Sequence, residues 1–215
     1  MKDSILVYSG GMDSTTLLYE QKDRISLAIN FNYGSKHNHA EFKYAYWNCE
    51  QLGIPFKVID LRDVFSNFKS HLLMDGGDIP KGHYEDESMK KTVVPFRNGI
   101  MMAIASGICE SNAQKRVLLA NHFGDHAIYP DCRETFLDAF KTSVKEGTWN
   151  QTEIYAPYTK LTKRQIAQRG HKIGIDYKMT WSCYEGGTTH CGECGTCVER
   201  KEALEGNDPT QYLVS

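Results

Sequence analysis

The feature that most constrains this chain is a glycine-rich loop close to its N-terminus. Residues 9–14 are Ser-Gly-Gly-Met-Asp-Ser, between an apolar run at residues 5–8 and a helix-like segment at residues 15–22. Glycines let the backbone turn sharply and approach an anion, and the free N–H groups at the start of a helix point toward it. The position predicts a strand–loop–helix unit that binds phosphate, with an ordinary strand–turn–helix corner as the alternative.

Strand-like and helix-like segments alternate along the rest of the chain. Apolar runs typical of strands lie at residues 5–8, 25–31, 54–61, 117–120 and 153–156. Segments with helical character lie at residues 15–22, 37–52, 98–111, 136–145 and 162–172. This alternation predicts an α/β fold, with a Rossmann-like parallel five-stranded sheet and helices on both faces. Thr162 and Gln165 have the spacing of a capping box, which places the start of the last helix.

Composition and charge favour a small-molecule substrate. The chain has 215 residues, of which 40% are hydrophobic, so it can bury a substantial core. The chain has 25 basic and 27 acidic residues. With a net charge of -2, it therefore lacks the excess of positive charge that favours binding to nucleic acid or to an anionic membrane. No signal peptide or membrane-spanning stretch is visible. We therefore expect a cytoplasmic protein whose cysteines are reduced or bound to metal.

The phosphate loop (residues 9–14) contains an acidic residue that phosphate alone would repel. Asp13 is explained if it shares a Mg²⁺ ion with the phosphates, since a hard cation binds carboxylate and phosphate oxygens together. No Gly-Lys-Ser/Thr follows the glycines, so this is not a Walker loop. It resembles the loop of the ATP-pyrophosphatase (PP-loop) superfamily, whose members transfer AMP to a substrate oxygen and release pyrophosphate. The residues expected to contact ATP are Tyr8, Ser9, Gly10, Gly11, Met12, Asp13, Ser14, Thr15 and Thr16.

Four cysteines near the C-terminus have the spacing of a metal site. Cys183, Cys191, Cys194 and Cys197 follow the pattern C-x7-C-x2-C-x2-C. Four thiolates complete a tetrahedral shell for zinc and leave no open position, which indicates a structural role. An iron–sulfur cluster and a redox pair at Cys194 and Cys197 are the alternatives. Cys183 is the weakest ligand assignment, and Cys132 is its substitute if the fold brings it near.

Three basic residues are candidate ligand contacts: Arg97 at the start of the helix after the long loop, Lys36 after the second predicted strand, and Lys163 at the start of a helix near the same sheet edge, where ligands bind in open α/β sheets. Arg97 suits a carboxylate or phosphate, or else it is a surface residue beside a helix cap at Asn98. Lys36 is a candidate contact for phosphate or the acid, and Lys163 is a candidate contact for phosphate, or else they are solvated lysines.

The segment after the fourth predicted strand adds three further polar residues. Asp125 and Asp131 suit the N–H edge of a guanine-like base, and Arg133 suits an anion. Helix capping is the alternative role for all three. The long loop at residues 75–92 is a candidate lid, with a passive surface loop as the alternative.

Together, five segments resemble the QueC family of 7-cyano-7-deazaguanine synthases. They are SGGMDSTTLL at 9–18, NYGSKH at 32–37, VVPFRN at 93–98, GDHAIYPDCR at 124–133 and WSCYEGGTTHCGECGTCVERKEAL at 181–204. The first motif identifies the superfamily, whereas the last two are more specific. One departure is Phe96, where we expect a glycine before the Arg-Asn pair.

The resemblance implies a fold of the adenine-nucleotide alpha hydrolase type and a ligase that forms a carbon–nitrogen bond. Its substrates would be 7-carboxy-7-deazaguanine, ammonia and ATP, and an acyl adenylate and an amide would precede the nitrile in queuosine biosynthesis. It also implies structural Zn²⁺, Mg²⁺ with ATP, and a homodimer. The catalytic residues would be Asp13, Lys163 and Lys36, and the substrate contacts would be Arg97, Asn98, Asp125, Asp131 and Arg133.

We expect three regions along the chain. Residues 1–180 form the ATP-pyrophosphatase domain, residues 181–205 a zinc-binding knuckle with a C-terminal helix, and residues 206–215 a loose tail. Three other functions stay open at this point. The chain could be another PP-loop enzyme such as a tRNA thiolase, a relative that acts on a protein in a defence system, or a zinc-binding module without catalysis.

Overall fold

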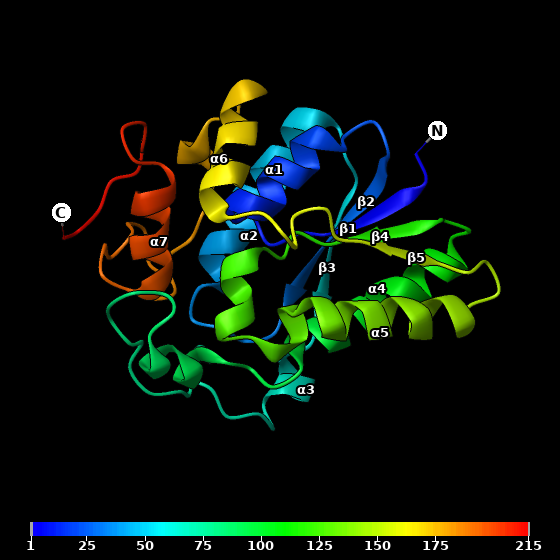
Figure 1. Ribbon diagram of the computed structural model, residues 1–215, viewed down its shortest axis with the longest axis horizontal. Helices are drawn as coiled ribbons and strands as arrows, with labels where there is room; N and C mark the ends of the chain where they lie inside the picture. Colours follow the sequence, from blue (N-terminus) through cyan, green and yellow to red (C-terminus); the bar gives the residue numbers. More distant parts are fainter. Residues whose placement is uncertain (1, 215) are drawn as a thin grey trace.

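A computed structural model describes residues 2–214 and confirms the α/β fold (Figure 1). The sheet has five strands in the order β3-β2-β1-β4-β5, and every neighbouring pair is parallel. The strands are β1 (Ser4–Val7), β2 (Ile25–Asn32), β3 (Phe56–Asp60), β4 (Arg116–Leu118) and β5 (Glu153–Tyr155). The order changes direction between β1 and β4, and ligands of open α/β sheets bind at the carboxyl ends of the strands at such a point.

Helices cover both faces of the sheet (Figure 1). Successive side chains of a strand point to opposite faces, so Ile5 and Leu6 of β1 belong to different core clusters. On the face of Leu6 lie α1 (Met12–Glu20), α2 (Asn38–Leu52) and α6 (Lys163–Lys172). On the face of Ile5 lie α4 (Arg97–Ser111) and α5 (Glu134–Glu146).

The predicted elements are all present, with shifted ends. The first helix begins at Met12 rather than at residue 15, so half of the phosphate loop already forms its first turn. The capping box of α6 is confirmed, with Thr162 N–H donating to Gln165 Oε1 at 2.9 Å. The short helix α3 (Arg62–Phe65) was not predicted, because one helical turn has no recognisable periodicity.

The C-terminal region packs beside the sheet rather than extending it (Figure 1). The cysteine knuckle (residues 183–197) leads into α7 (Gly195–Ala203), which packs against α6. The segment after Glu205, which we expected to be loose, is hydrogen-bonded to this region. Leu213 N–H donates to the His190 carbonyl at 2.8 Å, and Arg200 Nε donates to Thr210 Oγ1 at 2.7 Å.

The long loop at residues 75–92 crosses from the sheet to the knuckle. Gly82 N–H donates to the Glu193 carbonyl at 3.0 Å, and a short 3-10 helix, Glu87–Thr92, ends the loop. The loop is therefore fastened to the knuckle and carries Tyr84 in a buried position.

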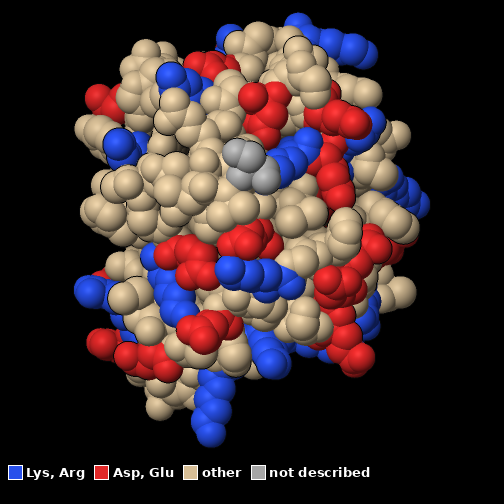
Figure 2. All heavy atoms as spheres, turned by 90° about the vertical axis from the view of Figure 1, so that its left-hand side faces the viewer, with Lys and Arg blue, Asp and Glu red and all other residues tan. Residues whose placement is uncertain are grey.

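Lysine and arginine side chains alternate with aspartate and glutamate on the face that carries α7 (Figure 2). No helix within residues 2–214 has both the length and the apolar composition needed to cross a membrane.

Phe96 precedes α4 in the left-handed region, with φ 55°. This conformation costs a residue with a side chain about 1–2 kcal/mol, a cost that the glycine expected here from the family resemblance would avoid. The Phe96 ring packs edge-to-face on Phe136, with centroids 5.5 Å apart, and it also covers Gly99. A Cβ atom at Gly99 would lie 2.5 Å from the Phe96 ring.

We predict that Gly99→Ala destabilises the protein by about 1–3 kcal/mol because the new methyl group overlaps the Phe96 ring. The loss should shrink when Gly99→Ala is combined with Phe96→Gly. Urea unfolding of the two single variants and the double variant measures the coupling. The control is Gly107→Ala in the same helix, where nothing lies within 4 Å of a Cβ, so it should stabilise by about 0.5–1 kcal/mol. An equal Gly99→Ala cost in both backgrounds would contradict this account.

Candidate active site and metal centre

A cavity of about 220 Å³ opens at the carboxyl ends of β1, β2 and β4. One end is formed by the phosphate loop, through Ser9, Gly11, Asp13 and Ser14. The other end is formed by polar and aromatic side chains around Arg97. The location agrees with the expectation that ligands bind beyond these strand ends.

Glycine is required at the turn of the phosphate loop. Gly10 has φ 91°, and a Cβ there would lie 2.6 Å from the Glu41 carbonyl oxygen and 2.9 Å from Ala45 N. Ser9 Oγ accepts from Gly11 N–H at 3.1 Å and pairs with Ser14 Oγ at 3.0 Å. The loop therefore brings its backbone against α2 and turns its hydroxyl groups toward the cavity.

Five of the nine residues expected to contact ATP line the cavity, namely Tyr8, Ser9, Gly11, Asp13 and Ser14. The other four, Gly10, Met12, Thr15 and Thr16, do not line it. Three of those four have buried side chains. Met12 packs under α6, Thr15 pairs with the Tyr8 hydroxyl, and Thr16 pairs with the Tyr177 hydroxyl.

Lys163, a candidate phosphate contact in the sequence, lies beside Asp13 of the phosphate loop. Its Nζ is 3.4 Å from Asp13 Oδ2 and 2.6 Å from Glu199 Oε2. Burial lowers the pKa of Lys163, but the carboxylates of Asp13 and Glu199 outweigh burial and raise it above its ordinary value. The first residue of α6 therefore places a permanent ammonium group beside the phosphate loop.

Two further residues near Asp13 and Lys163, His122 and Glu199, were not predicted from the sequence. His122 Nε2 lies within 3.5–3.8 Å of carboxylate oxygens of Asp13, Asp125 and Glu199. His122 directly follows β4, a position that marks it as a candidate, whereas no local pattern indicates that Glu199 of α7 reaches the site. We call Asp13, His122, Asp125, Lys163 and Glu199 the charge cluster.

One carboxylate oxygen of Asp13 in the charge cluster lacks a hydrogen-bond partner within residues 2–214. This atom, Oδ1, is buried. An orphaned carboxylate oxygen beside a phosphate-binding loop fits a divalent cation that travels with the nucleotide.

Asp125 lines the cavity with both carboxylate oxygens engaged. Oδ1 accepts from the Tyr84 hydroxyl and Oδ2 from His122 N–H, each at 2.9 Å. Burial raises the pKa of Asp125, but the neighbouring His122 and Lys163 outweigh it, and the net pKa is lowered.

Of the other predicted substrate contacts, one lines the cavity and two do not. Asn98 lines the cavity, and its N–H donates to Asp131 Oδ2 at 2.7 Å. Asp131 is buried at the start of α4 and does not line the cavity. Arg133 donates to the His126 carbonyl at 3.0 Å, and it too does not line the cavity.

Lys36, the third predicted catalytic residue, is half-buried. It donates to the Gly77 carbonyl at 2.6 Å and does not line the cavity. In this structure it connects the second strand's loop to the long loop at residues 75–92 rather than to the charge cluster.

Arg97 presents most of its hydrogen-bonding capacity to the cavity. Its one side-chain hydrogen bond within residues 2–214 is from Nη1 to the Tyr33 hydroxyl at 2.9 Å, and it forms no ion pair there. The guanidinium lies 5.2 Å from the Tyr33 ring centre and 6.0 Å from that of Tyr129. Since a guanidinium has five N–H donors, Arg97 can hold an anion or a carbonyl oxygen of a ligand.

Glu41 of α2 lies at the same end of the cavity. Its carboxylate is 3.9 Å from His37 Nε2, and within residues 2–214 it makes no hydrogen bond. Burial raises the pKa of Glu41 to about 8, although the charge of Arg97 opposes the shift.

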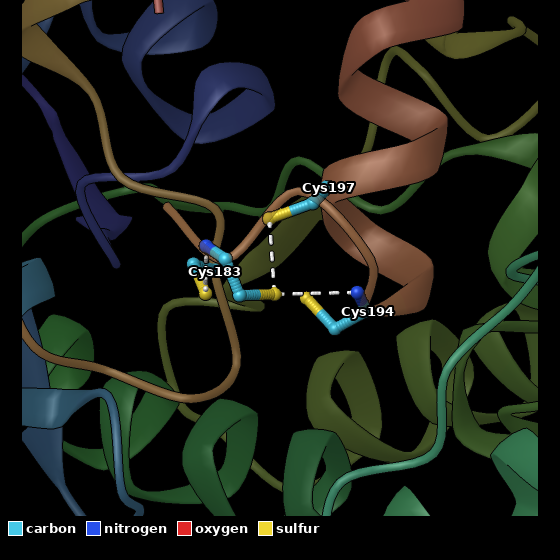
Figure 3. Close-up of side chains that lie close together, drawn as sticks. Cys183, Cys194 and Cys197 are labelled. Carbon is cyan, nitrogen blue, oxygen red and sulfur yellow. Dashed lines mark hydrogen bonds between the residues drawn. The ribbon is translucent and has the colours of Figure 1, made fainter. Parts of the chain in front are cut away.

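The four cysteines converge as predicted (Figure 3). The sulfur atoms of Cys183, Cys191, Cys194 and Cys197 all lie within 4.8 Å of one another. Two backbone amides, of Glu193 and Cys194, donate to Cys191 Sγ at 3.4 and 3.3 Å. Hydrogen bonds from Cys194 and Cys197 lower the pKa of Cys183, which favours a thiolate. The group has the donors and the spacing to hold one metal ion.

Cys132 is not the substitute ligand that the sequence allowed. It lies in the wall of the cavity, where its sulfur accepts from Asn98 Nδ2 at 3.0 Å, and it is not part of the cysteine group.

We predict that Glu41→Gln becomes progressively more stabilising as pH rises from 5.5 to 8. Unfolded Glu41 loses its proton near pH 4.5, whereas the folded carboxyl holds it to about pH 8. Between these values the unfolded state binds fewer protons, so the wild-type protein loses stability with rising pH by up to about 1.4 kcal/mol per pH unit. Gln does not titrate and escapes this loss.

Urea unfolding of the wild type and Glu41→Gln at pH 5.5, 6.75 and 8 measures the difference. Glu50→Gln, at an exposed position of the same helix, is the control and should show a difference that does not change with pH. A Glu41→Gln difference that stays constant over this range would contradict a buried, protonated Glu41.

Comparisons with known proteins agree with this geometry. The family model described as queuosine biosynthesis protein QueC matches residues 3–208. A 7-cyano-7-deazaguanine synthase from Porphyromonas gingivalis is 56% identical, over 98% of this chain and 97% of the relative. One from Desulfotalea psychrophila is 50% identical over the full length of both chains. One from Caldicellulosiruptor saccharolyticus is 42% identical, over 98% of this chain and 96% of the relative. The chain therefore belongs to the QueC family.

Proposed function

We propose that this chain is a 7-cyano-7-deazaguanine synthase, which converts 7-carboxy-7-deazaguanine and ammonia into 7-cyano-7-deazaguanine at the expense of ATP. One observation carries the proposal. The phosphate loop and the half-buried Arg97 line a single cavity, and Lys163 lies beside Asp13 of that loop, so a nucleotide and an acid can meet there. Relatives of nearly equal length carry the same name.

The reaction needs two activations of one carbon atom. A carboxylate oxygen of the acid attacks the α-phosphorus of ATP, which gives an acyl adenylate and pyrophosphate. Ammonia attacks the acyl carbon, and AMP leaves with the carboxylate oxygen. The amide oxygen then attacks a second ATP, and loss of AMP and a proton gives the nitrile. Each turnover consumes two ATP molecules and releases two AMP and two pyrophosphate molecules.

Both activations concentrate negative charge on the phosphate that is transferred. The Lys163 ammonium, 3.4 Å from Asp13 of the phosphate loop, and the N–H groups of the first turn of α1 would stabilise that charge. Mg²⁺ bound with ATP would neutralise further charge, and Asp13 with its unpaired Oδ1 is the residue that would hold it.

The acyl adenylate must also be kept from water. Aromatic side chains of Tyr84, Tyr129 and Tyr184 form part of the cavity wall. Tyr84 comes from the long loop at residues 75–92, which is fastened to the knuckle. We propose that this loop acts as the cover of the cavity.

The four cysteines are proposed to bind structural zinc. Tetrahedral Zn–S bonds of about 2.3 Å place sulfur atoms about 3.8 Å apart, and Cys191 Sγ lies 3.9 Å from Cys197 Sγ. Sulfur atoms this close surround one ion rather than the several irons of a cluster. Thiols that must stay reduced for this purpose suit the cytosol.

The surface supports a free small molecule over tRNA as the substrate. Charges of both signs alternate on the face with α7, and the whole chain carries a net charge of -2 (Figure 2). An RNA-binding surface would instead gather lysine and arginine.

The direct test is to incubate the zinc-loaded protein with Mg-ATP, ammonium and 7-carboxy-7-deazaguanine and to follow the products by mass spectrometry. We expect the nitrile, with two AMP molecules for each nitrile formed. AMP without amide or nitrile would move the search to another acid. Absence of ATP turnover by a folded, metal-loaded protein would refute the proposal.

We predict that Lys163→Gln lowers kcat/KM for ATP by about 10²–10³-fold, because the charge beside the transferred phosphate is lost. Steady-state pyrophosphate release measures the effect. Lys160→Gln is the matched control, since this nearby lysine is exposed and pairs with Glu134. Equal rates for the wild type and Lys163→Gln would show that Lys163 has no part in phosphate transfer.

We predict that removal of the metal loosens residues 183–214 and lowers activity, because the cluster fixes the start of α7 and Glu199 behind it. Hydrogen exchange should show loss of protection in this segment while the strands stay protected. Added zinc should restore both protection and activity. A metal-free protein with intact protection and full activity would contradict the structural role.

A further inference from the structure

We propose that Glu41 is the residue that recognises the guanine-type edge of the substrate. Its carboxylate would accept hydrogen bonds from the ring N–H and the adjacent amino group of the base, and Arg97 would donate to an oxygen of the same molecule. The inference rests on the proposed function, and it names a specificity-determining residue in the same cavity.

Three carboxylates line the cavity, and two of them are already engaged. Asp13 belongs to the charge cluster, 3.4 Å from Lys163. Asp125 accepts from the Tyr84 hydroxyl and from His122 N–H. Glu41 accepts no hydrogen bond within residues 2–214, so it alone presents a free carboxyl group, which would give up its proton when it accepts hydrogen bonds from a ligand.

Among residues 2–214, His37 is the one basic group within 4.0 Å of the Glu41 carboxylate, and it cannot act as a cation there. Arg97 donates to the Tyr33 oxygen, so the Tyr33 hydroxyl hydrogen is free to point at His37 Nε2, 3.2 Å away. An Nε2 atom that accepts this bond belongs to a neutral imidazole. Burial and the nearby Arg97 also lower the pKa of His37 to about 3. Glu41 therefore has no cationic partner of its own.

Arg97 and Glu41 form a complementary pair of binding groups that do not satisfy each other. They share one end of the cavity, and Arg97 is near enough to oppose the pKa shift of Glu41. No ion pair within 4.0 Å joins them among residues 2–214. An open donor group and an open acceptor group suit a ligand edge that carries an oxygen next to two N–H donors.

A guanine-type edge has this order of groups, whereas adenine does not. The guanine-type edge presents a carbonyl oxygen, a ring N–H and an amino group in series, and one carboxylate spans the two donors. Adenine presents an amino group next to a ring nitrogen acceptor, which suits a side-chain amide such as Asn or Gln. The chemistry of Glu41 therefore matches the deazaguanine acid rather than the base of ATP.

The test compares the wild type with Glu41→Gln on two acids, using the full-length zinc-loaded protein. One acid is 7-carboxy-7-deazaguanine, and the other is the same acid without the 2-amino group. We expect the wild type to bind the amino-bearing acid about ten- to a hundred-fold more tightly in calorimetry. Glu41→Gln should lose most of this preference, and its KM for ATP should stay within about two-fold. Glu50→Gln, at an exposed position of the same helix, should keep the wild-type preference.

Three results would overturn the inference. They are a Glu41→Gln variant that keeps the preference, a wild type without a preference, and a variant whose KM rises for ATP rather than for the acid. Thermal unfolding checks that the variant is folded, and its expected gain in stability makes a folding failure a contradiction as well. Because calorimetric binding of the two acids needs no turnover, the two outcomes that concern the preference are separate from the proposed function, which fails if the wild type makes no nitrile.

Discussion

The site depends on the ion pairs that Lys163 makes with two carboxylates of other helices. Lys163 carries a permanent charge that would be costly to bury alone, and Asp13 and Glu199 offset that cost at 3.4 and 2.6 Å. The partners come from helices that are distant in sequence, α1 for Asp13 and α7 for Glu199. The ion pairs therefore connect the phosphate loop, α6 and the C-terminal region beside the cavity that Asp13 lines.

This arrangement explains why a small metal-binding region belongs in the fold. The cysteine knuckle fixes the start of α7, and Glu199 follows Cys197 on its first turns. The buried Arg200 fixes the same helix from its other side, with Nη1 donating to Thr180 Oγ1 at 2.8 Å. The carboxylate next to Lys163 is thus held by two independent anchors rather than by a flexible terminus.

Local patterns predicted most of the fold, because each pattern lies within a short stretch of the sequence. They are the apolar runs of the strands, the glycine turn, the Thr162 cap and the cysteine spacing. The glycine expected at Phe96 proved informative, because the position has φ 55°. Glu199 and Glu41 could not be placed in this way. Each lies on a helix whose orientation toward the cavity is set by packing between segments far apart in the chain.

The polar residues of the loops show the same limit. The composition of the segment at residues 124–133 indicates a ligand site, but it does not say which side chains the backbone itself will use. Asp131 accepts from Asn98 N–H, and Arg133 donates to a carbonyl, so both satisfy the protein's own groups. Only the three-dimensional arrangement distinguishes them from Arg97, whose donors stay open to the cavity.

The central claim is that the acid is activated by direct attack on the α-phosphorus of ATP in this cavity. The most direct measurement uses 7-carboxy-7-deazaguanine labelled with ¹⁸O in both carboxylate oxygens. The account predicts that each nitrile is accompanied by two AMP molecules that carry one ¹⁸O each, while pyrophosphate stays unlabelled. Unlabelled AMP, or label in phosphate or pyrophosphate, would contradict it.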